Sequence, residues 1–237
     1  GWRHQPFMPV EFSVAAYRFG HSMVRNSYRT NAAVRGFQNF APIFDNNGTP
    51  NPDDLRGFRP MEGRNSIQWD WFLPMTSSSG PFPQMARKID TKLANALSHL
   101  HEASPPLDLL NVLAYRNLKR SWTFGLPAGT DVAKKLCIDP IELADGEPDS
   151  LWYYLLREAE IGGGNSLGHL GSLIVCAVIA GLIKGDPNSW LNLDPCWNPD
   201  NDPLLQGQDY NRDDDSWTLA SIIRIAGLKA DGIGREP

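Results

Sequence analysis

The sequence has few cysteines, no excess of positive charge and no long uninterrupted hydrophobic run. Three cysteines among 237 residues are too few and too scattered for a disulfide framework or a zinc site. With 22 basic and 27 acidic residues, the net charge is −5, which argues against a general binder of nucleic acid or anionic membranes. The most apolar stretch, 167–183, contains three glycines and a histidine and is shorter than the roughly 20 residues that cross a bilayer. We therefore expect no membrane span and interpret 167–183 as a buried helix.

The first residues also lack the features of a complete secreted precursor. Gly1-Trp2-Arg3-His4 contains no initiator methionine and is not followed by a basic and then apolar signal segment. We expect that a segment has been removed or that the chain begins inside a larger protein. The cellular compartment depends on that segment, and our expectation favours a secreted or periplasmic location over a cytoplasmic one.

Apolar residues recur at helical spacing along most of the chain, and no β alternation of any length occurs. The 21 glycines and 19 prolines predict long ordered loops, above all at 41–68, 74–84 and 193–215. We predict a mostly α fold in one structural unit, with long irregular loops and little or no β structure. The predicted helices are 10–29, 85–100, 107–121, a short helix capped by Thr130, a helix capped by Ser150 and ended by 162–164, then 167–183 and 216–226.

His21 lies in the first predicted helix, between aromatic and small residues. Gly20 beside it leaves room for a large group, and Arg18 and Arg25 share roughly its face of the helix. An imidazole with cations nearby suits a metal ligand whose cofactor carries carboxylates, as haem does. On this pattern alone, however, an ordinary core histidine is the more frequent case.

Two motifs, 16–22 and 117–127, carry a resemblance to a known family. Ala-Tyr-Arg-Phe-Gly-His-Ser at 16–22 resembles the proximal haem-ligand helix of the animal-type haem peroxidases, the myeloperoxidase-like superfamily. Asn-Leu-Lys-Arg-Ser at 117–121, followed by Gly-Leu-Pro at 125–127, is similar to the next motif of that family. The resemblance runs in order from about residue 6 to residue 228, and further stretches similar to bacterial members lie at 69–72, 89–93, 151–154, 167–171 and 219–227.

The resemblance implies a role for each matching residue. His21 is expected to bind haem iron as the proximal ligand, and Asn117 to accept the hydrogen bond of the other ring N–H. Arg120 is expected to pair with a haem propionate, and Arg18 is the analogous candidate on the His21 helix. The expected cofactor is haem b or a covalently linked derivative, with Asn117 and Arg18 assisting catalysis. The alternatives are a surface or capping role for Asn117 and, for Arg18, an ordinary ion pair with a carboxylate such as Glu11 or Asp108.

The distal part of the family's haem site has no counterpart in this sequence. In the family, the distal histidine and arginine, the carboxylates that esterify haem and the calcium loop lie far upstream of the proximal histidine. Only 20 residues precede His21. The resemblance therefore implies that 1–237 form the C-terminal, proximal-haem part of a peroxidase domain, and that an N-terminal half or partner chain supplies the distal part and any calcium. The remaining histidines resemble no distal motif: His4, His99, His101 and His169.

The expected function is a haem-dependent peroxidase that uses hydrogen peroxide to oxidise a halide or a small organic donor, this chain supplying the proximal side. One alternative is a fatty-acid dioxygenase of the same superfamily, which carries a catalytic tyrosine three residues before the proximal histidine. That position is Arg18 here, and Tyr17 leaves the helix about 100° away. Another alternative is a non-catalytic helical binding module that has lost haem. An absorption spectrum distinguishes the haem proteins from the module.

Overall fold

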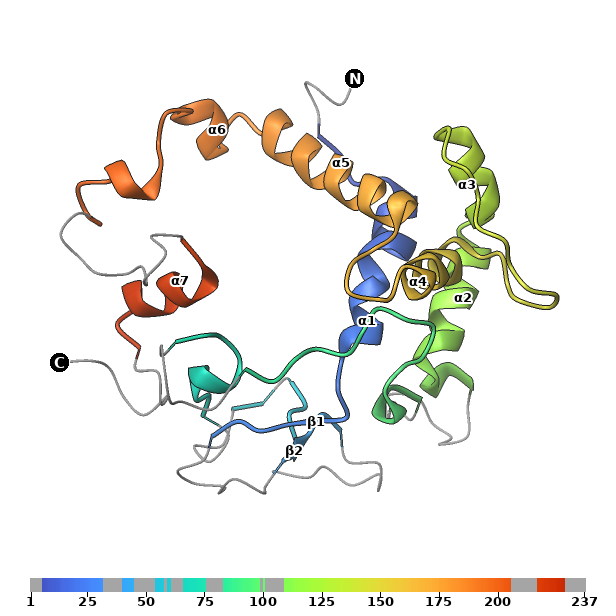
Figure 1. Cartoon of the computed structure of the whole chain (residues 1–237), viewed down its shortest axis with the longest axis horizontal. Helices are drawn as coiled ribbons and strands as arrows, with labels where there is room; N and C mark the ends of the chain where they lie inside the picture. The colour runs from blue at the N-terminus through green and yellow to red at the C-terminus, as the bar shows by residue number, and fades with distance from the viewer. Residues whose placement is uncertain are drawn as a thin grey trace. The chain divides into compact units, whose positions relative to one another are not determined.

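The structure, a computed structural model, describes residues 6–31, 40–44, 54–57, 59–60, 66–75, 83–98, 100, 109–205 and 217–228. The predicted mostly α fold is confirmed (Figure 1). Within these residues the only sheet joins two strands of two residues each, β1 (Ser27–Tyr28) and β2 (Ala41–Pro42), which run antiparallel. None of the described helices combines the length and the apolar character that crossing a membrane requires.

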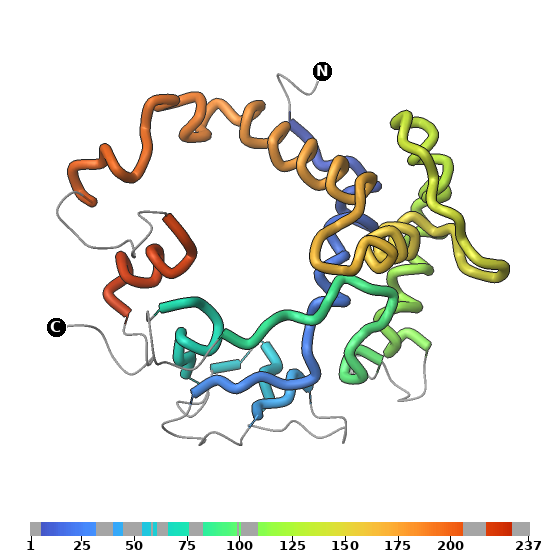
Figure 2. The backbone as a smooth tube through the Cα atoms, viewed as in Figure 1, coloured from blue at the N-terminus to red at the C-terminus, as the bar shows by residue number. Residues whose placement is uncertain are grey.

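The chain divides into two compact units where the sequence predicts one. The first unit consists of Gly1–Arg25 and Ala86–Pro195, and the second of Asn26–Met85 and Cys196–Pro237. In Figure 2 the first unit is the blue N-terminal segment together with the stretch that runs from green to orange. Each unit is therefore built from two segments that are distant in sequence.

The first unit holds most of the helices. It begins with an irregular helical segment in which a π-helix, η1 (Glu11–Ala15), passes into a 3-10 turn, η2 (Ala16–Phe19), and then into α1 (Gly20–Met23). The other elements of this unit, in chain order, are η5 (Asn95–Ser98), η6 (Leu109–Asn111), α2 (Leu113–Thr123), α3 (Gly129–Lys135), α4 (Leu151–Ile161), α5 (His169–Gly185) and α6 (Trp190–Leu193).

Helix α4 forms the centre of the first unit. It packs against η1, η2, α2, α3 and α5, and most of its side chains are buried. A helix that is apolar on nearly all sides is stable only when other elements surround it. The contact with α3 is so close that a Cβ atom on Gly129 would lie 2.2 Å from Cγ of Tyr154. The Tyr154 hydroxyl accepts a hydrogen bond from the Ile141 N–H, 2.9 Å away, which ties the loop after α3 to α4.

A carboxylate of α4 accepts hydrogen bonds from the first turn of α5. The N–H groups of Leu170 and Gly171 donate to Oε1 and Oε2 of the buried Glu158, at 2.9 and 3.2 Å. The interpretation of 167–183 as a buried helix is wrong for most of its length. Only three residues of α5 are buried, and its exposed apolar side chains include Leu173, Ile179 and Ile183.

Two other predicted helices are shorter than expected. The predicted helix 10–29 ends at Met23, because Val24 is extended and leads into β1. The stretch 85–100 has apolar residues at helical spacing, yet among its described residues, 85–98 and 100, only Asn95–Ser98 forms a turn of helix. Its N–H groups bond to distant segments instead, for example Ile89 to the Gly164 carbonyl at 2.8 Å and Leu100 to the Asn111 carbonyl at 2.8 Å. These long-range bonds outweigh the local helical pattern.

The predicted helix caps are only partly correct. Thr130 lies inside α3, whose N-cap is Ala128, and its hydroxyl donates to the Asp149 carboxylate. Ser150 is the N-cap of α4, but its hydroxyl makes no capping bond. The predicted helix 107–121 corresponds to η6 and α2, and residues 107–108 lie outside the described residues.

In the second unit, the described residues form β1, β2, two 3-10 turns and one helix. The turns are η4 (Trp69–Trp71) and η7 (Pro199–Asn201), and α7 (Leu219–Ile225) falls within the predicted helix 216–226. Thr218 and Ser221 form a reciprocal capping box at the start of α7. The Arg224 guanidinium donates to the Met75 carbonyl at 3.1 Å, which connects the two sequence segments of this unit.

Candidate functional site

The two motif residues His21 and Asn117 meet in the first unit. His21 belongs to α1 and Asn117 to α2, and His21 Nδ1 lies 3.1 Å from Asn117 Nδ2. The Asn117 side chain is completely buried, which is unusual for an asparagine without a specific partner. The Ser121 hydroxyl donates to the backbone carbonyl of Asn117 at 3.2 Å. The surface alternative for Asn117 is therefore wrong, and its side chain faces the imidazole.

The orientation of the Asn117 amide decides which nitrogen of His21 is free. As placed, Nδ2 faces the ring and the buried Oδ1 has no hydrogen-bond partner among the described residues. Rotating the amide by 180° exchanges oxygen and nitrogen with almost no change of shape. Oδ1 then accepts a hydrogen bond from Nδ1–H, and His21 Nε2 carries the free lone pair that a metal needs. Both orientations use the same contact with the ring.

Helix α4 holds the segment that carries His21. Ala15 and Ala16 are completely buried where η1 and η2 pack on α4. The Trp152 indole N–H donates to the Arg18 carbonyl at 3.4 Å, three residues before His21. Sequence analysis did not assign Trp152 a role, although Trp152 lies in the stretch 151–154 that resembles bacterial members of the family. The position of His21 thus depends on side chains of α2 and α4 together.

Two arginines surround the imidazole with positive charge. Burial lowers the pKa of His21, and the charges of Arg18 and Arg120 lower it further. Burial, and then the charge of Arg120, also lowers the pKa of Arg18, and the buried Arg18 Nε has no hydrogen-bond partner in the described part of the chain. Neither guanidinium forms an ion pair with a described carboxylate, so the proposed ordinary ion pair of Arg18 with Glu11 is absent. The positive charges of Arg18 and Arg120 would therefore attract an anionic ligand.

The donor set matches the polar parts of haem. Haem requires a neutral imidazole as an iron ligand and cations for its two propionates. The lowered pKa of His21 favours the neutral ring, and Arg18 and Arg120 are the two cations. A Cβ atom added to Gly20 would have no heavy atom within 4 Å, so the backbone beside His21 is open on that side. These residues therefore fit a haem whose carboxylates face the arginines.

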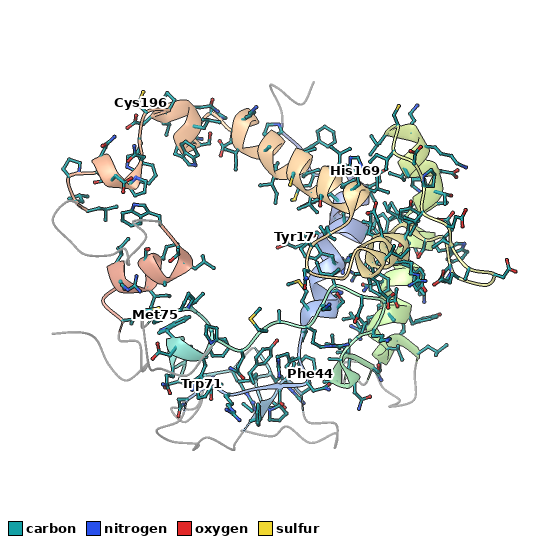
Figure 3. The ribbon with its side chains drawn as sticks, in the orientation of Figure 1. Tyr17, Phe44, Trp71, Met75, His169 and Cys196 are labelled. Atoms are coloured by element: carbon teal, nitrogen blue, oxygen red, sulfur yellow. The ribbon has the colours of Figure 1, made fainter. Side chains whose placement is uncertain are left out.

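Tyr17 bears on the dioxygenase alternative. Its side chain is 67% exposed, and its ring lies against the ring of Phe12, with ring centroids 5.4 Å apart. Figure 3 shows Tyr17 projecting outward from the segment that carries His21. The position three residues before His21 belongs to Arg18. The arrangement therefore places no tyrosine where that chemistry requires one.

The remaining candidate ligands do not join this site. His169 is exposed at the first turn of α5, and the three cysteines are exposed and unpaired. His4, His99 and His101 lie outside the described residues, as does Asp108. Over the described ranges, no three His, Cys, Asp or Glu side chains converge as a metal site. The cluster of His21, Asn117, Arg18 and Arg120 is thus the one site that the predicted residues form together.

Comparisons with known proteins add no relative to this picture. No protein-family model matches the sequence, and no curated protein matches it as a relative.

Proposed function

We propose that this chain supplies the proximal side of a haem-dependent peroxidase. His21 binds the haem iron through Nε2, and Asn117 accepts the hydrogen bond of Nδ1–H. Arg18 and Arg120 pair with the haem carboxylates. The observation that supports this most strongly is the contact between His21 and the buried Asn117 amide, 3.1 Å apart across 96 residues of sequence. The resemblance to animal-type haem peroxidases rests on the same residues.

When bound, haem b or its covalently linked form supplies the redox-active iron that reacts with hydrogen peroxide and oxidises a halide or a small organic donor. The residues of this chain orient the ligand and set its charge. A neutral amide that accepts the Nδ1–H fixes the plane of the ring but withdraws the proton less than a carboxylate would. The imidazole therefore stays neutral. Arg18 and Arg120 bind the negatively charged carboxylates of the cofactor.

The first experiment tests the ligand. The full chain is titrated with haem, and the Soret band is followed for the wild type, His21→Ala and His169→Ala. We expect His21→Ala to lose the shifted Soret band of bound haem and His169→Ala to keep it, because the exposed His169 has no partner in the cluster. A full band at an unchanged wavelength in His21→Ala would exclude His21 as the ligand. If the wild type did not shift and sharpen the Soret band of the added haem, the result would favour the non-catalytic module.

The second experiment tests the contact with Asn117. Asn117→Asp places a charged acceptor on Nδ1–H, which increases the imidazolate character of the ring and stabilises ferric iron. We expect a lower reduction potential in spectroelectrochemical titrations, while Asn117→Ala binds haem more weakly because the ring is less restrained. Potentials that stay the same in both variants would contradict a hydrogen bond between Asn117 and His21.

A further expectation concerns the distal side of the haem. Peroxide cleavage requires a general acid–base group and a cation, contributed in our proposal by an N-terminal half or partner chain. General acid–base catalysis typically contributes ~10²–10⁴-fold in rate. The chain alone should therefore react slowly with peroxide in stopped-flow measurements. A fast reaction of the isolated chain would show that it builds its own distal site.

A further inference from the structure

A long apolar trough runs beside α5, away from the His21 cluster. It consists of two adjoining cavities of about 640 and 430 Å³, which share Pro9, Ala177 and Val178. We call it the α5 trough. Cavities of this size are typical of small-molecule sites, which are mostly apolar with a few polar groups. None of the His21 cluster residues lines it.

Three elements form the walls of the α5 trough. The segment before η1 supplies Pro9, and α3 supplies Val132 and Leu136. Helix α5 supplies seven residues between positions 173 and 184: Leu173, Ile174, Ala177, Val178, Ala180, Gly181 and Lys184. At 1.5 Å per residue, that part of α5 is about 16 Å long. It carries no charged residue between Leu173 and Ile183. The shape is thus elongated, and its length is lined by aliphatic groups.

The charges at the two ends of the α5 trough differ in sign. Glu11, Asp131 and Lys135 line the end beside α3, which gives that end a net negative charge. Lys184 lines the other end and is the only charged residue among the described residues that line it. None of these four side chains forms an ion pair within the described part of the chain. An elongated ligand with one anionic end is therefore attracted to Lys184 and repelled from the α3 end.

We propose that the α5 trough binds an anionic single-chain amphiphile, a long-chain carboxylate. Its head group lies at Lys184, and its tail runs along Ala177 and Val178 toward Val132. The apolar lining supplies most of the affinity, and the charge difference sets the direction. This site is independent of haem binding, so that each proposal can fail without the other.

Isothermal titration calorimetry of the full chain with sodium decanoate, dodecanoate and tetradecanoate, each below its critical micelle concentration, tests the lining. We expect one site per chain. Burial of a methylene contributes about 0.8 kcal/mol, so affinity should rise up to about fourfold per methylene and level off once the trough is full. A rise without a limit, or with many sites per chain, would indicate general surface adsorption and overturn the proposal.

Substitutions on α5 test the location. Ala177→Trp and Ala180→Trp place an indole inside the trough and should reduce dodecanoate affinity at least about tenfold, equivalent to about 1.4 kcal/mol. Ile179→Trp is the matched control, because Ile179 is exposed on the same helix and does not line the trough. Circular dichroism checks that all three variants fold. Equal affinities in the three variants would place the ligand elsewhere.

The two lysines test the direction. Exposed ion pairs contribute roughly 0.2–1 kcal/mol, so Lys184→Ala should weaken dodecanoate binding up to about fivefold. The same substitution should leave dodecanol binding unchanged, and Lys135→Ala should leave dodecanoate binding nearly unchanged. A larger effect at Lys135 than at Lys184 would overturn the proposed direction. Sedimentation velocity tests whether a second copy of the chain occupies the trough instead. A wild-type dimer that Ala177→Trp dissociates and that dodecanoate leaves intact would assign the trough to that second copy.

Discussion

Replacing Gly168 with alanine is expected to destabilise the first unit strongly, although the change adds a single methyl group. The backbone of Gly168 has φ −69° and ψ −172°, which any residue can adopt. The constraint is the lack of space for a side chain at this position. A Cβ atom at this position would lie 2.2 Å from Cγ, 2.4 Å from Cδ and 2.5 Å from Oε2 of Glu158. Because Glu158 is buried between α4 and α5, its carboxylate has to leave the start of α5.

The magnitude follows from the bonds that are lost. Glu158 accepts hydrogen bonds from the N–H groups of Leu170 and Gly171, at the positive end of the α5 dipole. A hydrogen bond to a charged group contributes about 1.5–3 kcal/mol, and the two bonds share one carboxylate. We therefore expect Gly168→Ala to reduce the free energy of unfolding by about 3 kcal/mol. That is a large part of the roughly 5–15 kcal/mol that stabilises a typical domain.

Equilibrium unfolding in guanidinium chloride, followed by tryptophan fluorescence, measures this difference. Gly181→Ala is the matched control on the same helix, since a Cβ atom there would meet no heavy atom within 4 Å. It should stabilise the protein by about 0.5–1 kcal/mol, because alanine is the better helix former. Equal stabilities of Gly168→Ala and the wild type would refute the role of Glu158 as the acceptor that holds α5.

Three further substitutions test the His21 site and the contact of α3 with α4. Arg18→Ala and Arg120→Ala each remove a positive charge and should raise the pKa of His21, measured by NMR titration without haem; an unchanged pKa would contradict their proximity. In the folded wild type this pKa lies below its ordinary value of 6.5, so the unfolded chain binds more protons and stability should fall as the pH falls below about 6.5. The decrease should be smaller in Arg18→Ala. Gly129→Ala forces a methyl group onto the buried Tyr154 ring and should cost at least about 1–3 kcal/mol in thermal unfolding, whereas a wild-type melting temperature would show that α3 can shift.

The helical elements could be predicted from sequence where local pattern and tertiary contacts agree. Helix α4 satisfies both, because its apolar residues and the following glycines delimit a helix that other helices then enclose. The stretch 85–98 has the local helical pattern, but its tertiary contacts do not favour a helix. Its backbone N–H groups at Arg87 and Ile89 bond to the carbonyls of Met23 and Gly164, partners that no local pattern identifies.

The candidate site was only partly predictable. The resemblance of the motifs at 16–22 and 117–127 to a known family implied that Asn117 faces His21, and the structure brings the two side chains together. The contribution of Trp152 could not be read from sequence, because its hydrogen bond goes to a backbone carbonyl, and backbone acceptors carry no residue signature. The same holds for the exposed face of α5, since an apolar helix looks alike in sequence whether covered or open.

The division of the chain into two interleaved units has a consequence for its modular construction. Segment 26–85 of the second unit interrupts the first unit, yet it leaves and returns at nearly the same point. The Arg87 N–H donates to the Met23 carbonyl at 3.0 Å, so the backbone on either side of the interruption is held together. Inserted domains are typically accommodated in this way, between chain ends that already lie close. The first unit, which contains both His21 and Asn117, therefore has the arrangement of a domain interrupted by segment 26–85. Because Met23 and Arg87 are hydrogen-bonded, we expect that a short turn from Arg25 to Ala86 could replace this segment in the chain of the first unit.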